Sequence, residues 1–450
     1  MTNETNNKHY LIIGLGLTGL SCARFCQARN LRFSLCDTRT ELPGIESIRA
    51  EFPQADIHLG LPDASELQHY DELLVSPGIS IATPQIREAA ESGVTISGDV
   101  QLFSEYRQQP LIAITGSNGK STVTTLVAEL LNAAGVKAKA CGNIGVPVLD
   151  LLTTDEHVEV YVAELSSFQL ETTRNLRADV AGILNISPDH MDRYDGMADY
   201  ERAKQRIFQG AKKVVVNGDD DHTLPALSIS AESRRFLLNV PAAGEFGVVY
   251  DNGDIWLSYG NDRLMNAADL NISGMHNVAN ALAALAFIDA IGVDIRKTLA
   301  SLATFTGLDH RCQKIGLIRG VDYVNDSKGT NEGSTVAAIE GLAPLTEGRL
   351  WLIAGGEGKG QSFKELAAAC QGRVEKALLF GADARFIEDA LADAVATEVF
   401  DTLDEALMVA AESACDGDTV LFSPACASFD QFRNYVHRGE YFRQCVEGLS

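Results

Sequence analysis

The chain has 450 residues, of which 46% are hydrophobic and 22% charged, as expected for a globular protein with more than one core. Its formal net charge of −24 argues against nucleic acid or an anionic membrane as a partner. The nine cysteines include no C-x-x-C pair, which is typical of reduced thiols rather than disulfides or a zinc site. Because no apolar run is long enough to cross a bilayer, we expect a cytoplasmic protein without membrane insertion.

Residues 1–98 are predicted to form a Rossmann-like domain. A strand at 9–13 precedes Gly14-Leu-Gly16-Leu-Thr-Gly19 and a helix, and a second strand ends in Asp37. Such a glycine turn binds a diphosphate, and an acid after the second strand can meet a ribose hydroxyl. Read alone, this pattern indicates an NAD site, although the same turn serves any diphosphate.

A second glycine turn marks the predicted central domain, residues 99–307. A buried strand at 111–115 leads into Gly116-Ser-Asn-Gly119-Lys120-Ser121-Thr122, and a helical apolar pattern follows. Here the turn's N–H groups and the helix N-terminus can face an anion, Lys120 adds positive charge, and Ser121 offers a hydroxyl to Mg²⁺. Ile114 stands where the usual phosphate-loop motif has its first glycine. We expect a nucleoside triphosphate here rather than a plain βα turn with a surface lysine.

Polar residues follow two further strands of this domain. Glu164 ends the strand that begins near Val158, and His190 lies between acids after the strand at 180–184. The carboxyl ends of parallel strands share one sheet edge, so both residues are candidates for facing a metal beside the glycine turn. By itself, Lys204 in its helical segment is typical of a solvated lysine. Asn280, near a helix start, serves as a cap or contacts a nucleotide base.

Residues 308–450 alternate between strand and helix patterns, which predicts a third Rossmann-like unit with a mostly parallel sheet. The chain is therefore predicted to be α/β, with a phosphate-loop ATPase-like central domain between two Rossmann-like ones.

Seven motifs, in order along essentially the whole chain, resemble those of the Mur ligase family: TGSNGKST, ELSSFQLE, DHMDRY, GMHNVANALAA, GLDHR, NDSKGTN and SPACASFDQF. Within the family the resemblance is to members that add D-glutamate to UDP-N-acetylmuramoyl-L-alanine in peptidoglycan precursor synthesis. It implies an ADP-forming ligase that acts through an acyl phosphate. The implied small-molecule partners are ATP, D-glutamate and UDP-N-acetylmuramoyl-L-alanine, and the implied state is a monomer. The first glycine turn then holds UDP, not NAD.

The resemblance also implies site residues. The UDP substrate would contact Leu17, Thr18, Asp37, Thr38, Arg39 and Gly78, with Asn143, Ser166 and Gln169 near its sugar and lactyl groups. ATP would contact Gly116, Ser117, Asn118, Gly119, Lys120, Ser121 and Thr122, together with Asn280, Arg311, Asp326 and Lys328. D-Glutamate would be framed by Thr330, Lys359, Ser428, Phe429 and Tyr435. Two Mg²⁺ ions would be held, one by Ser121 and Glu164, the other by His190 and a carbamylated Lys204. The implied catalytic residues are Lys120, His190 and Lys204.

Three positions depart from the family pattern, namely Gln313, Gly329 and Glu357. We expect altered affinity from them, not lost activity. Three other functions stay open. An NAD-dependent oxidoreductase would leave residues 116–122 unexplained, and the Ser428-Phe429 loop argues against a ligase that adds L-alanine to UDP-N-acetylmuramic acid. The third is a nucleotide-binding interaction module without enzymatic activity.

Overall fold

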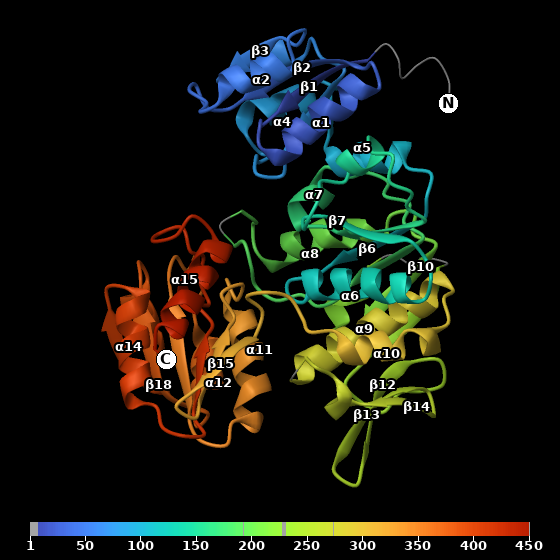
Figure 1. The fold of residues 1–450 in the computed structure, drawn as a ribbon. Coiled ribbons are helices and arrows are strands. Elements are labelled where there is room, and N and C mark those ends of the chain that lie inside the picture. Colours follow the sequence, from blue (N-terminus) through green and yellow to red (C-terminus); the bar gives the residue numbers. More distant parts are fainter. Residues whose placement is uncertain (1–7, 192, 227–230, 273, 450) are drawn as a thin grey trace. The chain divides into compact units, whose positions relative to one another are not determined.

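The computed structural model describes residues 8–191, 193–226, 231–272 and 274–449 (Figure 1). Its strands form mostly parallel sheets, with helices between many of the successive strands. The chain divides into two compact units. The first comprises Met1–Asn185, Ala198–Phe236 and Ala283–Thr298, and the second comprises Ile186–Met197, Leu237–Leu282 and Leu299–Ser450. The predicted class, α/β with three domains, is confirmed, whereas the boundaries at 98/99 and 307/308 stay predictions.

The N-terminal sheet is parallel throughout and has the order β3-β2-β1-β4-β5. Its strands are β1 His9–Ile13, β2 Arg32–Asp37, β3 Ile57–Leu59, β4 Glu72–Val75 and β5 Thr95–Ser97. The accompanying helices are α1 Leu17–Ala28, α2 Ile45–Glu51, α3 Ala64–Leu67, α4 Pro84–Glu91 and α5 Asp99–Tyr106. Chain order reverses between β1 and β4, and in open parallel sheets ligands bind at such a switch point.

The parallel strands of the central region have the order β11-β10-β9-β6-β8-β7. They are β6 Leu111–Thr115, β7 Ala138–Gly142, β8 Val160–Glu164, β9 Val180–Ile183, β10 Lys213–Asn217 and β11 Glu232–Phe236. Helices α6 Lys120–Ala133, α7 Ser167–Glu171, α8 Met197–Gln205, α9 Met275–Ile291 and α10 Leu299–Thr304 accompany the central region. The buried ring of Phe287 packs so closely on β9 that a Cβ at Gly182 would lie 2.5 Å from it.

Three antiparallel strands belong to the second unit: β12 Phe246–Asp251, β13 Asp254–Tyr259 and β14 Asp262–Asn266. Asn252 and Gly253 join the first two with φ values of 51° and 91°. Both angles are positive, as a two-residue hairpin turn of the I′ type requires. The Asn252-Gly253 pair therefore forms the hairpin turn between β12 and β13.

The C-terminal sheet has the order β15-β16-β20-β17-β18-β19, and only β15 runs antiparallel to its neighbour. Its strands are β15 Gln313–Ile318, β16 Val321–Asn325, β17 Leu350–Gly355, β18 Val374–Phe380, β19 Ala396–Phe400 and β20 Thr419–Phe422. The helices are α11 Glu332–Leu342, α12 Lys364–Cys370, α13 Ala384–Leu391, α14 Leu403–Ser413 and α15 Tyr435–Glu447. Alternate residues of β17 enter two hydrophobic clusters, one on each face, so the sheet is covered on both sides.

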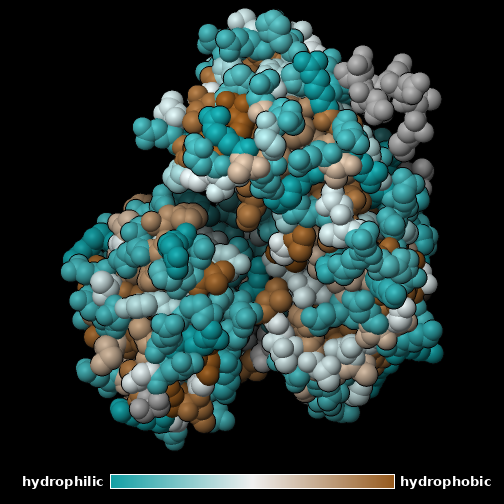
Figure 2. All heavy atoms as spheres, turned by 45° about the horizontal axis from the view of Figure 1, so that its top comes forward, coloured by the Kyte–Doolittle hydropathy of each residue, from teal (hydrophilic) through white to brown (hydrophobic). Residues whose placement is uncertain are grey.

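Short 3₁₀ helices complete the structure at Asp150–Leu152, Arg206–Phe208, Asp221–Thr223, Ala267–Asp269, Ile295–Lys297 and Ala343–Leu345. The face drawn in Figure 2 is mostly polar, with apolar residues in small groups. Within the described part of the chain, no helix is both long enough and apolar enough to cross a membrane.

Candidate functional site

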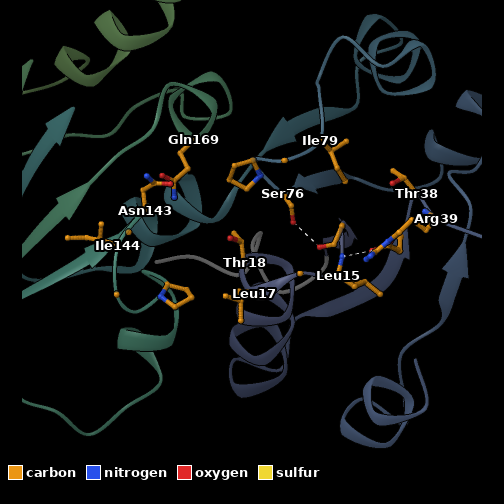
Figure 3. Close-up of a pocket in the computed structure, with 18 residues that line it drawn as sticks. Leu15, Leu17, Thr18, Thr38, Arg39, Ser76, Ile79, Asn143, Ile144 and Gln169 are labelled. Atoms are coloured by element: carbon orange, nitrogen blue, oxygen red, sulfur yellow. Dashed lines mark hydrogen bonds and ion pairs between the residues drawn. The ribbon is translucent and has the colours of Figure 1, made fainter. Parts of the chain in front are cut away.

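A pocket of about 500 Å³ opens at the switch point of the N-terminal sheet. Its lining includes eight of the nine residues predicted to hold the UDP substrate, namely Leu17, Thr18, Asp37, Thr38, Arg39, Gly78, Asn143 and Gln169. Figure 3 shows Thr38 and Arg39 on one side, Asn143 and Gln169 on the other, and Leu17 and Thr18 between them. The Leu17 side chain is 81% exposed, which leaves an apolar surface for a planar ring. Ser166, the ninth, is not among the lining residues.

Asp37 fixes the positions of Leu15 and Arg39, which both line this pocket. Its carboxylate accepts hydrogen bonds from the Leu15 N–H at 2.9 Å and from the Arg39 Nε at 2.7 Å and Nη2 at 3.0 Å. The Arg39 hydrogen bonds lower the pKa of Asp37 to about 2, so the side chain is ionised at any physiological pH. Across the turn, the Ser76 hydroxyl donates to the Gly14 carbonyl at 2.8 Å, as drawn in Figure 3.

Asn143 connects the pocket to the central sheet. Its backbone N–H donates to the Glu164 carbonyl at 2.9 Å, and its side-chain Nδ2 donates to Glu164 Oε1 at 2.8 Å. The preceding Gly142 has φ 100°, and a Cβ there would lie 2.3 Å from the Glu164 carbonyl. Only glycine permits this approach, so the loop after β7 is bound closely to the end of β8.

Ser166 and Gln169 form a capping box at the start of α7, which the sequence analysis did not identify. Gln169 Oε1 accepts from the Ser166 N–H at 3.1 Å, while Gln169 Nε2 donates to the buried carboxyl of Asp99 at 3.3 Å. Burial raises the pKa of Asp99 to about 6. Gln169 thus reaches the pocket with a fixed amide, and Ser166 has a structural function as a cap. The spacing S-x-x-Q is the signal that could have revealed it.

The glycine turn lies between β6 and α6, as predicted. Its Gly119 has φ 77° and precedes the first helical residue, Lys120. The Lys120 ammonium folds back and donates to the Gly116 and Ser117 carbonyls, both at 2.8 Å. Asn185, at the end of β9, accepts from the Ser117 N–H with its carbonyl and from the Asn118 N–H with its Oδ1. The loop is therefore braced from the neighbouring strand, and the N–H groups of the first turn of α6 lie at its mouth.

Lys204 is a buried lysine, not the solvated one that its segment alone predicts. Only 1% of it is exposed, and its Nζ donates to the Gly116 carbonyl at 2.8 Å. The same nitrogen lies 4.6 Å from the ring centre of Tyr200, whose hydroxyl is 3.1 Å from Ser117 Oγ. Tyr200 and Lys204 are four residues apart on one face of α8, a spacing that could have indicated the pair.

The donor set at the end of β8 fits a hard cation. Glu164 Oε2 is buried and has no hydrogen-bond partner among the described residues, although burying a carboxylate oxygen unpaired is costly. Ser121 is also buried, in the first turn of α6. Carboxylate and hydroxyl oxygens are the ligands that Mg²⁺ prefers. No cluster of three histidine, cysteine or acidic residues suited to a metal occurs in the part of the chain described here.

His190 belongs to the second unit, whereas Lys204 and Glu164 belong to the first. Its backbone has φ 58°, and its N–H donates to Asp189 Oδ1 at 3.0 Å. Asp189 also accepts from Asn331 Nδ2 at 3.2 Å and lies 3.8 Å from the Lys359 ammonium. The assignment of His190 as a metal ligand stays a prediction.

Asp326 follows β16 at the carboxyl edge of the C-terminal sheet. Its carboxyl accepts from the Ser423 hydroxyl at 2.6 Å and from the Cys312 N–H at 3.1 Å. Burial raises the pKa of Asp326 to about 6. A Cβ at Gly329 would lie 2.5 Å from Asp326 Oδ2, so the glycine allows this loop to close tightly.

Four residues predicted for D-glutamate lie on loops at this same edge, namely Thr330, Lys359, Ser428 and Phe429. The Lys328 ammonium lies 4.1 Å from the ring centre of Tyr435, the first residue of α15. Ser428 is buried and Phe429 is 70% exposed, while the Thr330 N–H donates to the Lys328 carbonyl at 2.8 Å.

The remaining predicted and divergent residues have local partners. Asn280 donates to Asn277 on the first turns of α9. Gln313 accepts from the His310 N–H and donates to Asp309, which holds the turn around Arg311. The backbone of Glu357 pairs with that of Ala427. The ATP and D-glutamate assignments on these loops stay predictions.

Three family models match the chain in order. The Mur ligase MurD-like N-terminal domain matches residues 8–98, the Mur ligase middle domain residues 114–288, and the Mur ligase glutamate ligase domain residues 310–426. The UDP-N-acetylmuramoylalanine–D-glutamate ligase of Pseudomonas savastanoi pv. phaseolicola is 48% identical over 450 residues, with 100% of both chains covered. The enzyme of the same name from Methylobacillus flagellatus is also 48% identical, over 99% of this chain and 98% of its own.

Solved structures share the fold at low sequence identity. A UDP-N-acetylmuramate–alanine ligase from Thermotoga maritima matches with a TM-score of 0.61 at 17% identity, covering 99% of this chain and 100% of its own. A pseudomurein peptide ligase type C from Methanothermus fervidus gives 0.61 at 19% identity, with the same coverage. Since the family models span most of the chain and the relatives span all of it, this protein belongs to the Mur ligase family.

Proposed function

We propose that this protein is an ATP-dependent ligase that joins D-glutamate to UDP-N-acetylmuramoyl-L-alanine, with release of ADP and phosphate, in peptidoglycan precursor synthesis. The observation that carries the proposal is the position of Asn143. It lines the pocket at the switch point and also donates to Glu164, at the strand end beside the glycine turn. A substrate whose nucleotide part fills the pocket can therefore extend its other end toward the phosphates of ATP.

In the first step two anions must meet, the alanyl carboxylate of the substrate and the triphosphate of ATP. A carboxylate is a poor electrophile and must be activated before an amine can attack it. The carboxylate therefore attacks the γ-phosphorus of ATP, and ADP leaves as an acyl phosphate forms. Lys120 and the N-terminus of α6 would offset the negative charge on the transferring phosphoryl group. For this the Lys120 ammonium must leave the Gly116 and Ser117 carbonyls that it now contacts.

The second step forms the amide. The amine of D-glutamate attacks the acyl carbon, and phosphate leaves from a tetrahedral intermediate as the nitrogen gives up a proton. D-Glutamate carries two carboxylates, which suit the Lys359 ammonium and the hydroxyls of Thr330 and Ser428. Phe429 and Tyr435 would complete this site, while Arg311, Asp326, Lys328 and Asn280 would contact ATP.

Ser121 and Glu164 would hold one Mg²⁺, and His190 with a carbamate on Lys204 would hold a second; bound Mg²⁺ supplies charge neutralisation at the phosphoryl oxygens. An ammonium cannot ligate a cation, whereas a carbamate is an oxygen anion. CO₂ adds only to a neutral amine, so Lys204 Nζ, which donates to the Gly116 carbonyl, must lose a proton before it forms the carbamate. We further propose a cytoplasmic monomer.

Phosphate release tests the proposal directly. The protein is mixed with ATP, Mg²⁺ and UDP-N-acetylmuramoyl-L-alanine, and D-Glu, L-Glu, L-Ala, L-Lys and meso-diaminopimelate are added one at a time. We expect release with D-Glu alone. Release with another amino acid would keep the ligase chemistry and change its specificity. The absence of release with all five, together with tight NADH binding, would support an oxidoreductase instead.

A further inference from the structure

Arg438 is a fully buried cation in α15, with 0% of its surface exposed. Its guanidinium donates to four oxygens. Nε reaches Ser327 Oγ at 3.1 Å, and Nη2 reaches the Ser327 carbonyl at 2.8 Å. On the other side, Nη2 reaches the Cys426 carbonyl at 3.1 Å, and Nη1 reaches the Ala427 carbonyl at 3.2 Å. One side chain therefore holds two loops that are about a hundred residues apart in sequence.

The first of these loops carries residues of the proposed ATP site, and the second carries a residue of the proposed D-glutamate site. Ser327 lies between Asp326 and Lys328, and Ala427 precedes Ser428. The Ser327 hydroxyl also donates to the carbonyl of Tyr435, on the same helix as Arg438, at 2.8 Å. Any shift of the guanidinium would thus change the separation between Lys328 and Ser428.

The chemistry of this contact favours positioning over simple packing. A buried charge is costly, and apolar side chains of similar volume often stabilise a core as well or better. Burial lowers the pKa of Arg438 to about 10, so the group stays protonated at neutral pH and needs all of its acceptors. A planar fork with donors at fixed angles can set the distance between two backbone segments, which a flexible lysine cannot do.

We propose that Arg438 is a positioning residue for D-glutamate, fixing the spacing between the loop at 326–328 and the loop at 426–428. The proposal rests on the proposed function of these loops. It assigns to Arg438 no contact with the amino acid itself. Its expected signature is a rise in the KM for D-glutamate, with little change in the KM for the UDP substrate, whose pocket lies in the other unit.

The test uses the full-length protein and three variants. Arg438→Lys keeps the charge but loses the fork, and Ser327→Ala removes the side-chain acceptor of Arg438 Nε while it keeps the carbonyl of residue 327. Arg443→Lys is the matched control, since this arginine lies on the same helix and pairs with Glu440 at the surface. Steady-state kinetics give the KM for each substrate, and thermal unfolding identifies any variant that does not fold.

In Arg438→Lys we expect the D-glutamate KM to rise about tenfold to hundredfold, because a small misplacement of binding groups has effects of this size. Ser327→Ala should show a smaller rise, and Arg443→Lys none. Unchanged D-glutamate KM values in both folded variants would overturn the proposal. If Arg438→Lys does not fold, Ser327→Ala decides alone. The parent is measured first, because failure of the parent to use D-glutamate would overturn the proposed function rather than the positioning by Arg438.

Discussion

Replacing Lys204 by alanine is expected to lower D-glutamate-dependent phosphate release about a thousandfold or more, since it removes a proposed oxygen ligand of the second Mg²⁺. The side chain is buried and its Nζ is 2.8 Å from the Gly116 carbonyl, so alanine leaves position 204 without an amine that can carry the carbamate. Added acetate or formate should restore part of the activity by occupying the space of the carbamate. Release of phosphate is measured with and without each anion.

Lys212→Ala serves as the control, because that lysine is 73% exposed and pairs with Asp179 at the surface. Its activity should equal that of the parent. A Lys204→Ala variant with parent activity would contradict a catalytic function for this residue. An inactive but folded variant that no small carboxylate restores would count against the carbamate.

Replacing Lys120 by alanine should reduce kcat about a hundredfold to a thousandfold, the usual effect of removing one group that stabilises charge in the transition state. Since Lys120 begins α6 and reaches the Gly116 and Ser117 carbonyls, its loss removes positive charge from the mouth of the glycine turn. The kcat for phosphate release and the KM for ATP are measured by varying ATP while D-glutamate and the UDP substrate are held at saturating concentrations.

The exposed Lys137 provides a matched alanine control near the far end of the same helix, and its replacement should have no effect. A Lys120→Ala variant as fast as the parent would remove the phosphate-transfer function from this turn. That result would favour a nucleotide-binding module without enzymatic activity.

The strands, the helices and the glycine turns could be predicted from the sequence, because each depends on a short contiguous stretch of residues. The strands at 9–13 and 111–115 are present with the predicted bounds, and a glycine turn follows each of them. Strand and helix patterns depend on neighbours a few residues away, and the glycine turn is a contiguous motif. Leu17 and Gln169 lie far apart in sequence yet line one pocket, and only the resemblance to the family predicted that they share a site.

The contacts that could not be predicted join segments far apart in the chain. Asn185 braces the glycine turn from the next strand, and Arg438 holds loops about a hundred residues apart. The sequence around Asn185 and the sequence around Arg438 contain no motif that would distinguish either residue from a polar residue at the surface. The helical segment around Lys204 predicts a solvated lysine, whereas the packing of α8 buries the side chain. Pairings of this kind depend on tertiary packing, which overrides local preference.

Transfer of an isotopic label tests the central claim most directly. UDP-N-acetylmuramoyl-L-alanine with oxygen-18 in its alanyl carboxylate is incubated with ATP, Mg²⁺, D-glutamate and the protein, and the phosphate released is analysed by mass spectrometry. An acyl phosphate requires one carboxylate oxygen to leave with the phosphate, so we expect labelled phosphate in step with amide product. Amide product accompanied by unlabelled phosphate would contradict activation of the carboxylate by phosphoryl transfer.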